Sequence, residues 1–254
     1  MVKLSNVAHL KICSVLVALA LALQSHSQNL QLHYDFRHTL DPAHNASNFP
    51  TVYFEYFKSQ DSGRAFIKPG SFLIKMQADF LGQRNNMGKF FMQVAQSFRF
   101  WKPKVFLVAQ FSSGMGVTEP KQYSYYISNA YSFGISYPFQ WKGGWFNSML
   151  TYTYNALAKP SHDFLYSFYW GKGFWNYKFE FIGDFEVYSL NKNQGDELTK
   201  NLEGKWICFF GEPQFWYNLN KHLALGSKIN LYYHVLNFDD HFQVYPTIAL
   251  KYKL

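Results

Sequence analysis

Apolar and polar residues alternate with a period of two along most of this chain, and the alternation is strongest over residues 174–188. A helix would scatter the charges of such a segment around its circumference, whereas a strand places them all on one face. Only Ile182 departs from the pattern, in which Trp175, Tyr177, Phe179, Phe181, Phe185 and Val187 alternate with Asn176, Lys178, Glu180, Asp184 and Glu186. The segment is therefore predicted to be a strand between lipid and water.

The same alternation recurs along the chain and at its end, where Ile248, Leu250 and Tyr252 alternate with Thr247, Lys251 and Lys253. With roughly 9–11 residues for each spanning strand, turn residues divide the chain into about twelve strands: 30–38, 51–59, 71–81, 89–100, 104–113, 123–137, 145–155, 163–171, 174–188, 205–217, 223–235 and 242–253. When the connections between these strands are numbered in chain order, the even-numbered ones are short, apart from residues 60–70, and the odd-numbered ones are longer. We therefore expect an all-β fold, a closed antiparallel transmembrane β-barrel.

The first residues predict secretion. Lys3 and Lys11 precede an apolar run from Ile12 to Leu23, which is too short for a membrane helix but suits a signal peptide. We expect residues 1–27 to be a cleaved signal peptide and residues 28–254 to form one outer-membrane barrel. Only Cys208 then remains, which rules out an intramolecular disulfide. Aromatic residues make up 21% of the chain and charged residues only 16%, a mixture typical of membrane barrels.

Charges of both signs, together with aromatic rings, lie on the predicted inward faces of the strands. Two interpretations stay open: the charges pair across the lumen and fill a narrow barrel, or they orient a dipolar solute while the rings stack on it. The candidate lumen and solute-binding residues are Asp35, Arg37, Tyr53, Glu55, Lys75, Asp79, Arg99, Lys178, Glu180, Asp184 and Glu186.

Signals for catalysis, metal ions and cofactors are weak. A barrel hydrolase needs a serine or an acid beside a histidine, and the available pieces are His33 with Asp35, His162-Asp163 and Asp239-Asp240-His241. None lies in a motif, so we expect no enzyme and no catalytic residue. The histidines show no metal-ligand spacing such as His-x-x-x-His, and no phosphate-binding loop is present. Scattered lysines argue against nucleic acid and favour lipid phosphates as partners.

Several segments resemble the Tsx-like nucleoside-specific channels of bacterial outer membranes, and in particular a Bacteroides-type branch of that superfamily. They are Leu32-His33-Tyr34-Asp35-Phe36-Arg37, Val52-Tyr53-Phe54-Glu55-Tyr56-Phe57, Phe181-Ile182-Gly183-Asp184-Phe185-Glu186 and Glu212-Pro213-Gln214-Phe215. The similarity extends over nearly the whole mature chain, but it is one of pattern. The terminal Tyr252-Lys253-Leu254 departs from it, because barrel proteins usually end in an aromatic residue.

The resemblance implies a monomeric twelve-stranded barrel that passes nucleosides, with Glu55, Asp79, Asp184 and Glu186 placed comparably to the family's lumen residues. The leading hypothesis is passive, selective diffusion of a small polar solute. Two alternatives remain, a non-conducting structural or surface barrel and a rim-active lipid hydrolase or acyltransferase. Expected partners are outer-membrane lipid and lipopolysaccharide, the barrel-assembly machinery and the solute, without any cofactor.

Overall fold

The computed structural model describes residues 27–58, 66–82, 86–101, 104–118, 123–197, 199–236 and 239–254. Apart from Ser27, the predicted signal peptide lies outside the described residues. These residues form one four-residue helix, α2 (Arg37–Leu40), and otherwise strands: β1 (Ser27–Asp35), β2 (Phe49–Lys58), β3 (Lys68–Asp79), β4 (Lys89–Arg99), β5 (Phe106–Val117), β6 (Ser124–Trp141), β7 (Gly144–Asn155), β8 (Ser161–Phe174), β9 (Phe179–Asn191), β10 (Lys205–Gly211), β11 (Gln214–Asn218), β12 (Leu223–Tyr233) and β13 (Gln243–Lys253).

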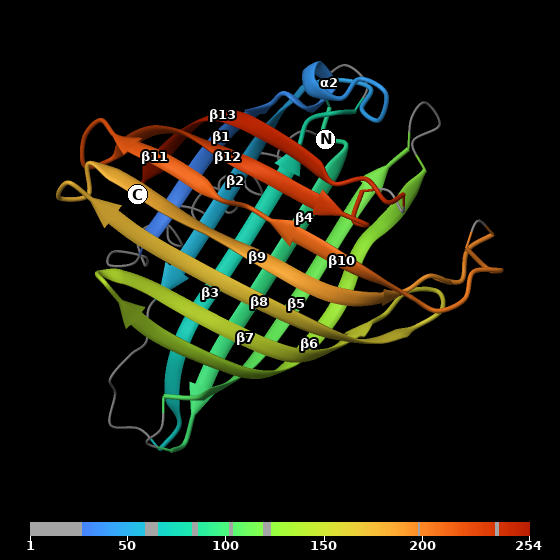
Figure 1. Ribbon diagram of the computed structural model, residues 1–254, viewed down its shortest axis with the longest axis horizontal. Coiled ribbons are helices and arrows are strands. Elements are labelled where there is room, and N and C mark those ends of the chain that lie inside the picture. The colour runs from blue at the N-terminus through green and yellow to red at the C-terminus, as the bar shows by residue number, and fades with distance from the viewer. Residues whose placement is uncertain are drawn as a thin grey trace, which may run out of the picture.

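All strands belong to one antiparallel sheet that closes on itself, because β13 pairs with β1 from Asn29↔Lys253 to Asp35↔Thr247. Figure 1 shows β13 beside β1 at this seam. Strands β10 and β11 share one position, since both pair with β9 on one side and with β12 on the other. The break between them falls at Glu212-Pro213, where proline has no N–H for the sheet ladder. The predicted closed barrel of twelve strands is confirmed.

The hairpin between β8 and β9 corrects one sequence prediction. One predicted strand ended at residue 171 and the next began at residue 174, but β8 continues to Phe174 and the turn occupies residues 175–178. The glycines belong to the strand because aromatic rings cover them: a Cβ on Gly171 would lie 2.1 Å from Nε1 of Trp145. Trp175, Asn176 and Tyr177 instead take positive φ angles of 48°, 52° and 60° and make the turn.

The barrel has two different ends. One, which we call the terminal mouth, holds Leu254 and tight turns such as residues 142–143, 175–178 and 219–222. The other, the loop mouth, holds α2 and the long connections 36–48 and 192–204. Connection lengths therefore follow the predicted alternation, again with the exception of the segment between β2 and β3.

The two faces of the sheet differ in polarity, as the alternation predicts. Buried inward positions are mostly polar, including Gln31, His33, Lys75, Gln93, Asp184, Gln214 and Lys228. Exposed outward positions are apolar, including Leu32, Tyr131, Phe133, Ile135, Leu150, Tyr152, Phe164, Ile248 and Leu250. Within the described part of the chain, no helix has the length and apolarity of a membrane span.

Candidate functional site: the barrel lumen

An ion-pair layer crosses the middle of the lumen, and we call its four members, Lys75, Asp184, Glu212 and Lys228, the central layer. Nζ of Lys75 on β3 lies 2.5 Å from Oδ1 of Asp184 on β9, and 3.7 Å from Oε2 of Glu212. Nζ of Lys228 on β12 lies 2.5 Å from Oε1 of Glu212. Because β3 and β9 are separated by five strands in the sheet order, the first pair spans the barrel instead of linking neighbours.

Aromatic and amide side chains surround the central layer. Lys228 donates a hydrogen bond to Oε1 of Gln77 (3.0 Å) and lies over the ring of Tyr53, 4.7 Å from its centroid. Lys75 lies 5.4 Å from the centroid of Tyr169. Side chains of the four charged residues are at most 7% exposed. Two cations and two anions thus face one another out of contact with water, although Oδ2 of Asp184 has no hydrogen-bond partner among the described residues.

A second charged group lies at the loop mouth. Arg37 donates to both carboxylate oxygens of Asp35, from Nη2 to Oδ2 at 2.8 Å and from Nε to Oδ1 at 3.1 Å. Its guanidinium also lies over the rings of Phe49 (4.7 Å) and Tyr245 (5.1 Å). Arg37 was predicted to lie in a strand, but it opens α2 instead, because alternation ends at Asp35. Its side chain nevertheless points inward and is buried.

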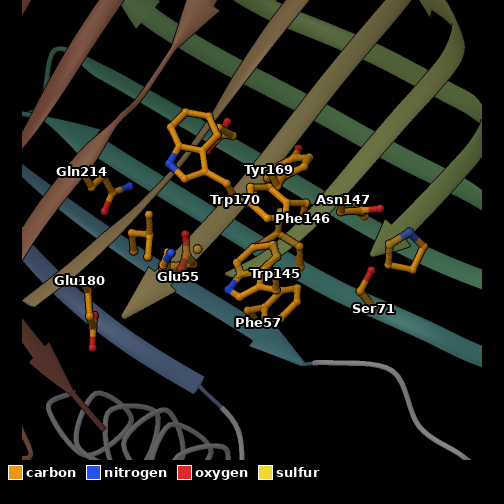
Figure 2. A pocket seen from close by; sticks show the side chains of 18 of the residues that line it. Glu55, Phe57, Ser71, Trp145, Phe146, Asn147, Tyr169, Trp170, Glu180 and Gln214 are labelled. Atoms are coloured by element: carbon orange, nitrogen blue, oxygen red, sulfur yellow. The ribbon is translucent and has the colours of Figure 1, made fainter. Parts of the chain in front are cut away.

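A cavity of about 1090 Å³ occupies the lumen between the terminal mouth and the central layer. Among the described residues its lining includes Lys75 and Asp184 but neither Asp35 nor Asp79, which lie nearer the loop mouth. Figure 2 shows side chains projecting into it from several strands, with Phe57 and Trp145 side by side. Their rings stack at a centroid distance of 5.6 Å and an angle of 12°.

Charges in the cavity are unequal in number. Among the described residues, its lining contains six bases (Lys75, Arg99, Lys104, Lys172, Lys251 and Lys253) and three acids (Glu55, Glu180 and Asp184). Two of the bases share one acid, because Glu180 accepts hydrogen bonds from Lys251 (3.1 Å) and Lys253 (2.6 Å). Glu55 accepts from the Tyr53 hydroxyl (3.1 Å) and from Asn29 (3.3 Å). The described lining of the cavity therefore carries more bases than acids.

Most of the predicted lumen residues do face the interior. Asp35 and Arg37 form one group, Lys75 and Asp184 another, and Asp79 accepts from Thr51 (2.8 Å). Glu186 accepts from Gln93 (3.2 Å), and Arg99 lies over Phe106 at 4.9 Å. The exception is Lys178: it lies in the turn after Trp175, exposed, over the ring of Tyr217. It was assigned to the lumen because the turn was placed too early.

Sequence reasoning missed Glu212, Lys228 and Lys251 as site residues. Lys228 carries a usable signal, since it alternates with Ile229 and Leu231 on a predicted strand. Glu212 precedes a proline inside a predicted strand. Because a proline interrupts the strand, the alternation of polar and apolar residues does not indicate which way Glu212 points. Lys251 had been placed on the polar face of the last strand without a role.

The histidines considered for catalysis are dispersed. His33 is buried in the lumen, bonded through Nδ1 to Thr247 (2.9 Å) and through Nε2 to Gln31 (2.8 Å). His162 is exposed and contacts the hydroxyl of Tyr152. His241 lies in the connection before β13, where its ring stacks on that of His44 at 5.2 Å. Asp35, proposed as the partner of His33, is instead held by Arg37.

Comparison with known proteins identifies a family without a described activity. Among solved structures, the KdgM porin aligns at 6% identity with a TM-score of 0.48, covering 90% of this chain and 99% of that one. The NanC porin aligns at 10% identity with a TM-score of 0.48, and the alignment covers 89% of this chain and 100% of that one. LpxR from Salmonella typhimurium aligns at 10% identity with a TM-score of 0.43, and the alignment covers 90% of this chain and 100% of that one. No curated protein matches the sequence. A family profile matches residues 27–254, and the chain therefore belongs to DUF5020, a domain of unknown function.

Proposed function

We propose that this chain is an outer-membrane barrel whose lumen is a channel for small polar solutes. The apolar exterior supports the membrane placement: Leu32, Phe133 and Leu150 are 54%, 53% and 52% exposed on the outward face. Soluble monomers rarely expose contiguous apolar patches above about 300–600 Å², whereas lipid requires such a surface around a barrel.

The observation that carries the channel proposal is the cavity that extends from the terminal mouth to Lys75 and Asp184. It lies inside a closed barrel, and it is lined by ionised and aromatic side chains of the kind that replace the hydration of a polar solute. A solute can therefore occupy this part of the lumen without any rearrangement of the strands.

The central layer is the constriction of this proposed channel. Passage requires Lys75 and Asp184 to separate, and breaking a buried ion pair costs about 3–5 kcal/mol. At the lower figure, the open state has a population of about one in a hundred, since 1.4 kcal/mol corresponds to a factor of ten. We therefore expect brief, infrequent conductance steps.

Nucleosides are the solute that we propose, on the strength of the sequence resemblance to Tsx-like channels. The cavity contains what such a solute needs: aromatic surfaces on Phe57 and Trp145 for a base, and the carboxylates of Glu55 and Glu180 for ribose hydroxyls. The excess of bases in the lining favours an anionic solute instead. Block of the channel by a nucleoside or by an anionic sugar distinguishes these two solutes.

The test is single-channel recording in planar bilayers, on the mature protein and on the variant Lys75→Ala/Asp184→Ala. The channel proposal expects small steps from the wild type, with more frequent and larger steps from the variant. Block by millimolar adenosine but not by galacturonate supports nucleosides, and the reverse supports anionic sugars. Absence of steps from both proteins would eliminate the channel.

A non-conducting barrel is the second candidate, and the burial of the central layer favours it. Its four charged side chains are almost inaccessible to solvent, as expected of groups that hold opposite walls together. In this case only the double variant would conduct.

A further inference from the structure

Two histidines and two aspartates meet at the loop mouth, from connections at opposite ends of the sequence. Asp41 and His44 follow α2, whereas Asp239 and His241 precede β13. Nδ1 of His44 lies 2.7 Å from Oδ1 of Asp41, and its Nε2 lies 3.6 Å from Oδ2 of Asp239. Nε2 of His241 lies 3.9 Å from Oδ2 of Asp41. We call these four residues the His–Asp cluster.

The barrel wall holds Asp41 in place. The hydroxyl of Tyr245 on β13 donates to Oδ2 of Asp41 at 2.8 Å. Nδ2 of Asn45 donates to the backbone carbonyl of Asp41 and to the Tyr245 hydroxyl, both at 3.0 Å. Outer contacts of this kind orient the ligands of metal sites. The carboxylate is thus fixed to the strand that closes the barrel, while both imidazole rings remain accessible.

The spacing of the donor atoms suits a small divalent ion. One ligand atom each from Asp41, His44 and His241 lies within 4.8 Å of the other two. A tetrahedral ion with bonds of about 2.0–2.1 Å holds its ligands about 3.3 Å apart, so the exposed side chains need to move by roughly 1 Å. Two imidazoles with carboxylate favour zinc and its first-row neighbours over magnesium or calcium, which prefer oxygen alone.

We propose that the His–Asp cluster binds a divalent transition-metal ion of the zinc class, with Asp41, His44 and His241 as ligands and Asp239 beside Nε2 of His44. The ion would tie the first connection of the barrel to the last. These connections flank the seam between β1 and β13, which is the pairing that closes the sheet. Metal binding therefore stabilises the closed barrel by mass action, because the unfolded chain lacks the assembled site.

The proposal is tested by titrating the tag-free mature protein in detergent micelles with Zn²⁺, using calorimetry and thermal unfolding. The variants are His44→Gln and His241→Gln. His162→Gln is the matched control, since His162 is an exposed histidine that lies outside the cluster. We expect one Zn²⁺ per wild-type chain and a raised unfolding midpoint. Each cluster variant should weaken binding by at least about tenfold, and the control should leave it unchanged.

A second measurement needs no variant to fold. Diethylpyrocarbonate modifies accessible imidazoles, and mass spectrometry locates the products. Zn²⁺ should protect His44 and His241 but not His162. Equal Zn²⁺ affinity in wild type and both cluster variants would overturn the proposal, as would unprotected cluster histidines at millimolar Zn²⁺. Binding of Mg²⁺ as tight as that of Zn²⁺ would overturn the assigned metal class.

Discussion

Removing Lys75 from the central layer should destabilise the barrel strongly, and removing its partner as well should restore most of the loss. In Lys75→Met, Asp184 keeps its burial but loses the only cation within 4 Å among the described residues. An uncompensated buried charge costs about 3–5 kcal/mol. In Asp184→Leu the effect should be smaller, because Lys75 retains Glu212 at 3.7 Å.

The double variant Lys75→Met/Asp184→Leu places apolar groups of similar volume across the lumen. Such replacements of buried pairs are often neutral or stabilising, so we expect a free energy of unfolding within about 1 kcal/mol of wild type. The coupling energy is then at least about as large as the cost of Lys75→Met alone, about 3–5 kcal/mol. The assay is equilibrium urea unfolding in lipid vesicles, followed by tryptophan fluorescence. Lys159→Met, at an exposed connection, is the control for loss of a lysine. Additive single effects, or Asp184→Leu costing more than Lys75→Met, would refute the reasoning.

Three further predictions concern the charges of the cavity lining, the outward face of β6 and the backbone at Gly183. The positive lining should make currents anion-selective in a KCl gradient, and Lys104→Gln with Lys172→Gln should shift the reversal potential toward zero; an unchanged potential would contradict this. Phe133→Lys, on the outward face of β6, should cost about 2–4 kcal/mol in vesicles, whereas a water-soluble barrel would tolerate it within about 0.5 kcal/mol. Gly183→Ala should destabilise the barrel by about 1–3 kcal/mol, since a Cβ there would lie 2.6 Å from the carbonyl oxygen of Glu212; urea midpoints equal to wild type would refute that contact.

The strands were predictable because most buried inward positions are polar and most exposed outward positions are apolar. The polarity that each strand position requires depends on that position alone, so it produces an alternation that is visible in the local sequence. The turn after β8 was misplaced for the opposite reason. Gly171 and Gly173 are required by the rings of Trp145 and Tyr177 that lie over them, and such a ring contact is not visible in local periodicity.

Pairing across the lumen was not predictable from the sequence. Lys75 and Asp184 are 109 positions apart, and their contact depends on the stagger of every intervening strand. Glu212 enters the layer because Pro213 interrupts the ladder between β10 and β11, which the predicted continuous strand of residues 205–217 did not include. Whether a side chain faces the lumen can therefore be predicted from the local sequence, whereas its ion-pair partner depends on the closed barrel as a whole.

The distribution of charge divides the lumen into two parts with different roles. In the central layer, Lys75 and Lys228 are matched by Asp184 and Glu212, so the group adds no net charge and can hold the walls together without attracting ions. In the described lining of the cavity on the terminal-mouth side of this layer, omitting the pair Lys75 and Asp184 leaves five bases and two acids. Lys104 and Lys172 form no ion pair within the described residues, so their charge is available to a solute. If the lumen served only to fill the barrel, matched charges would suffice throughout. Counted over the described residues, the excess of cations on the accessible side therefore supports the proposed channel, with an anionic solute entering from the terminal mouth.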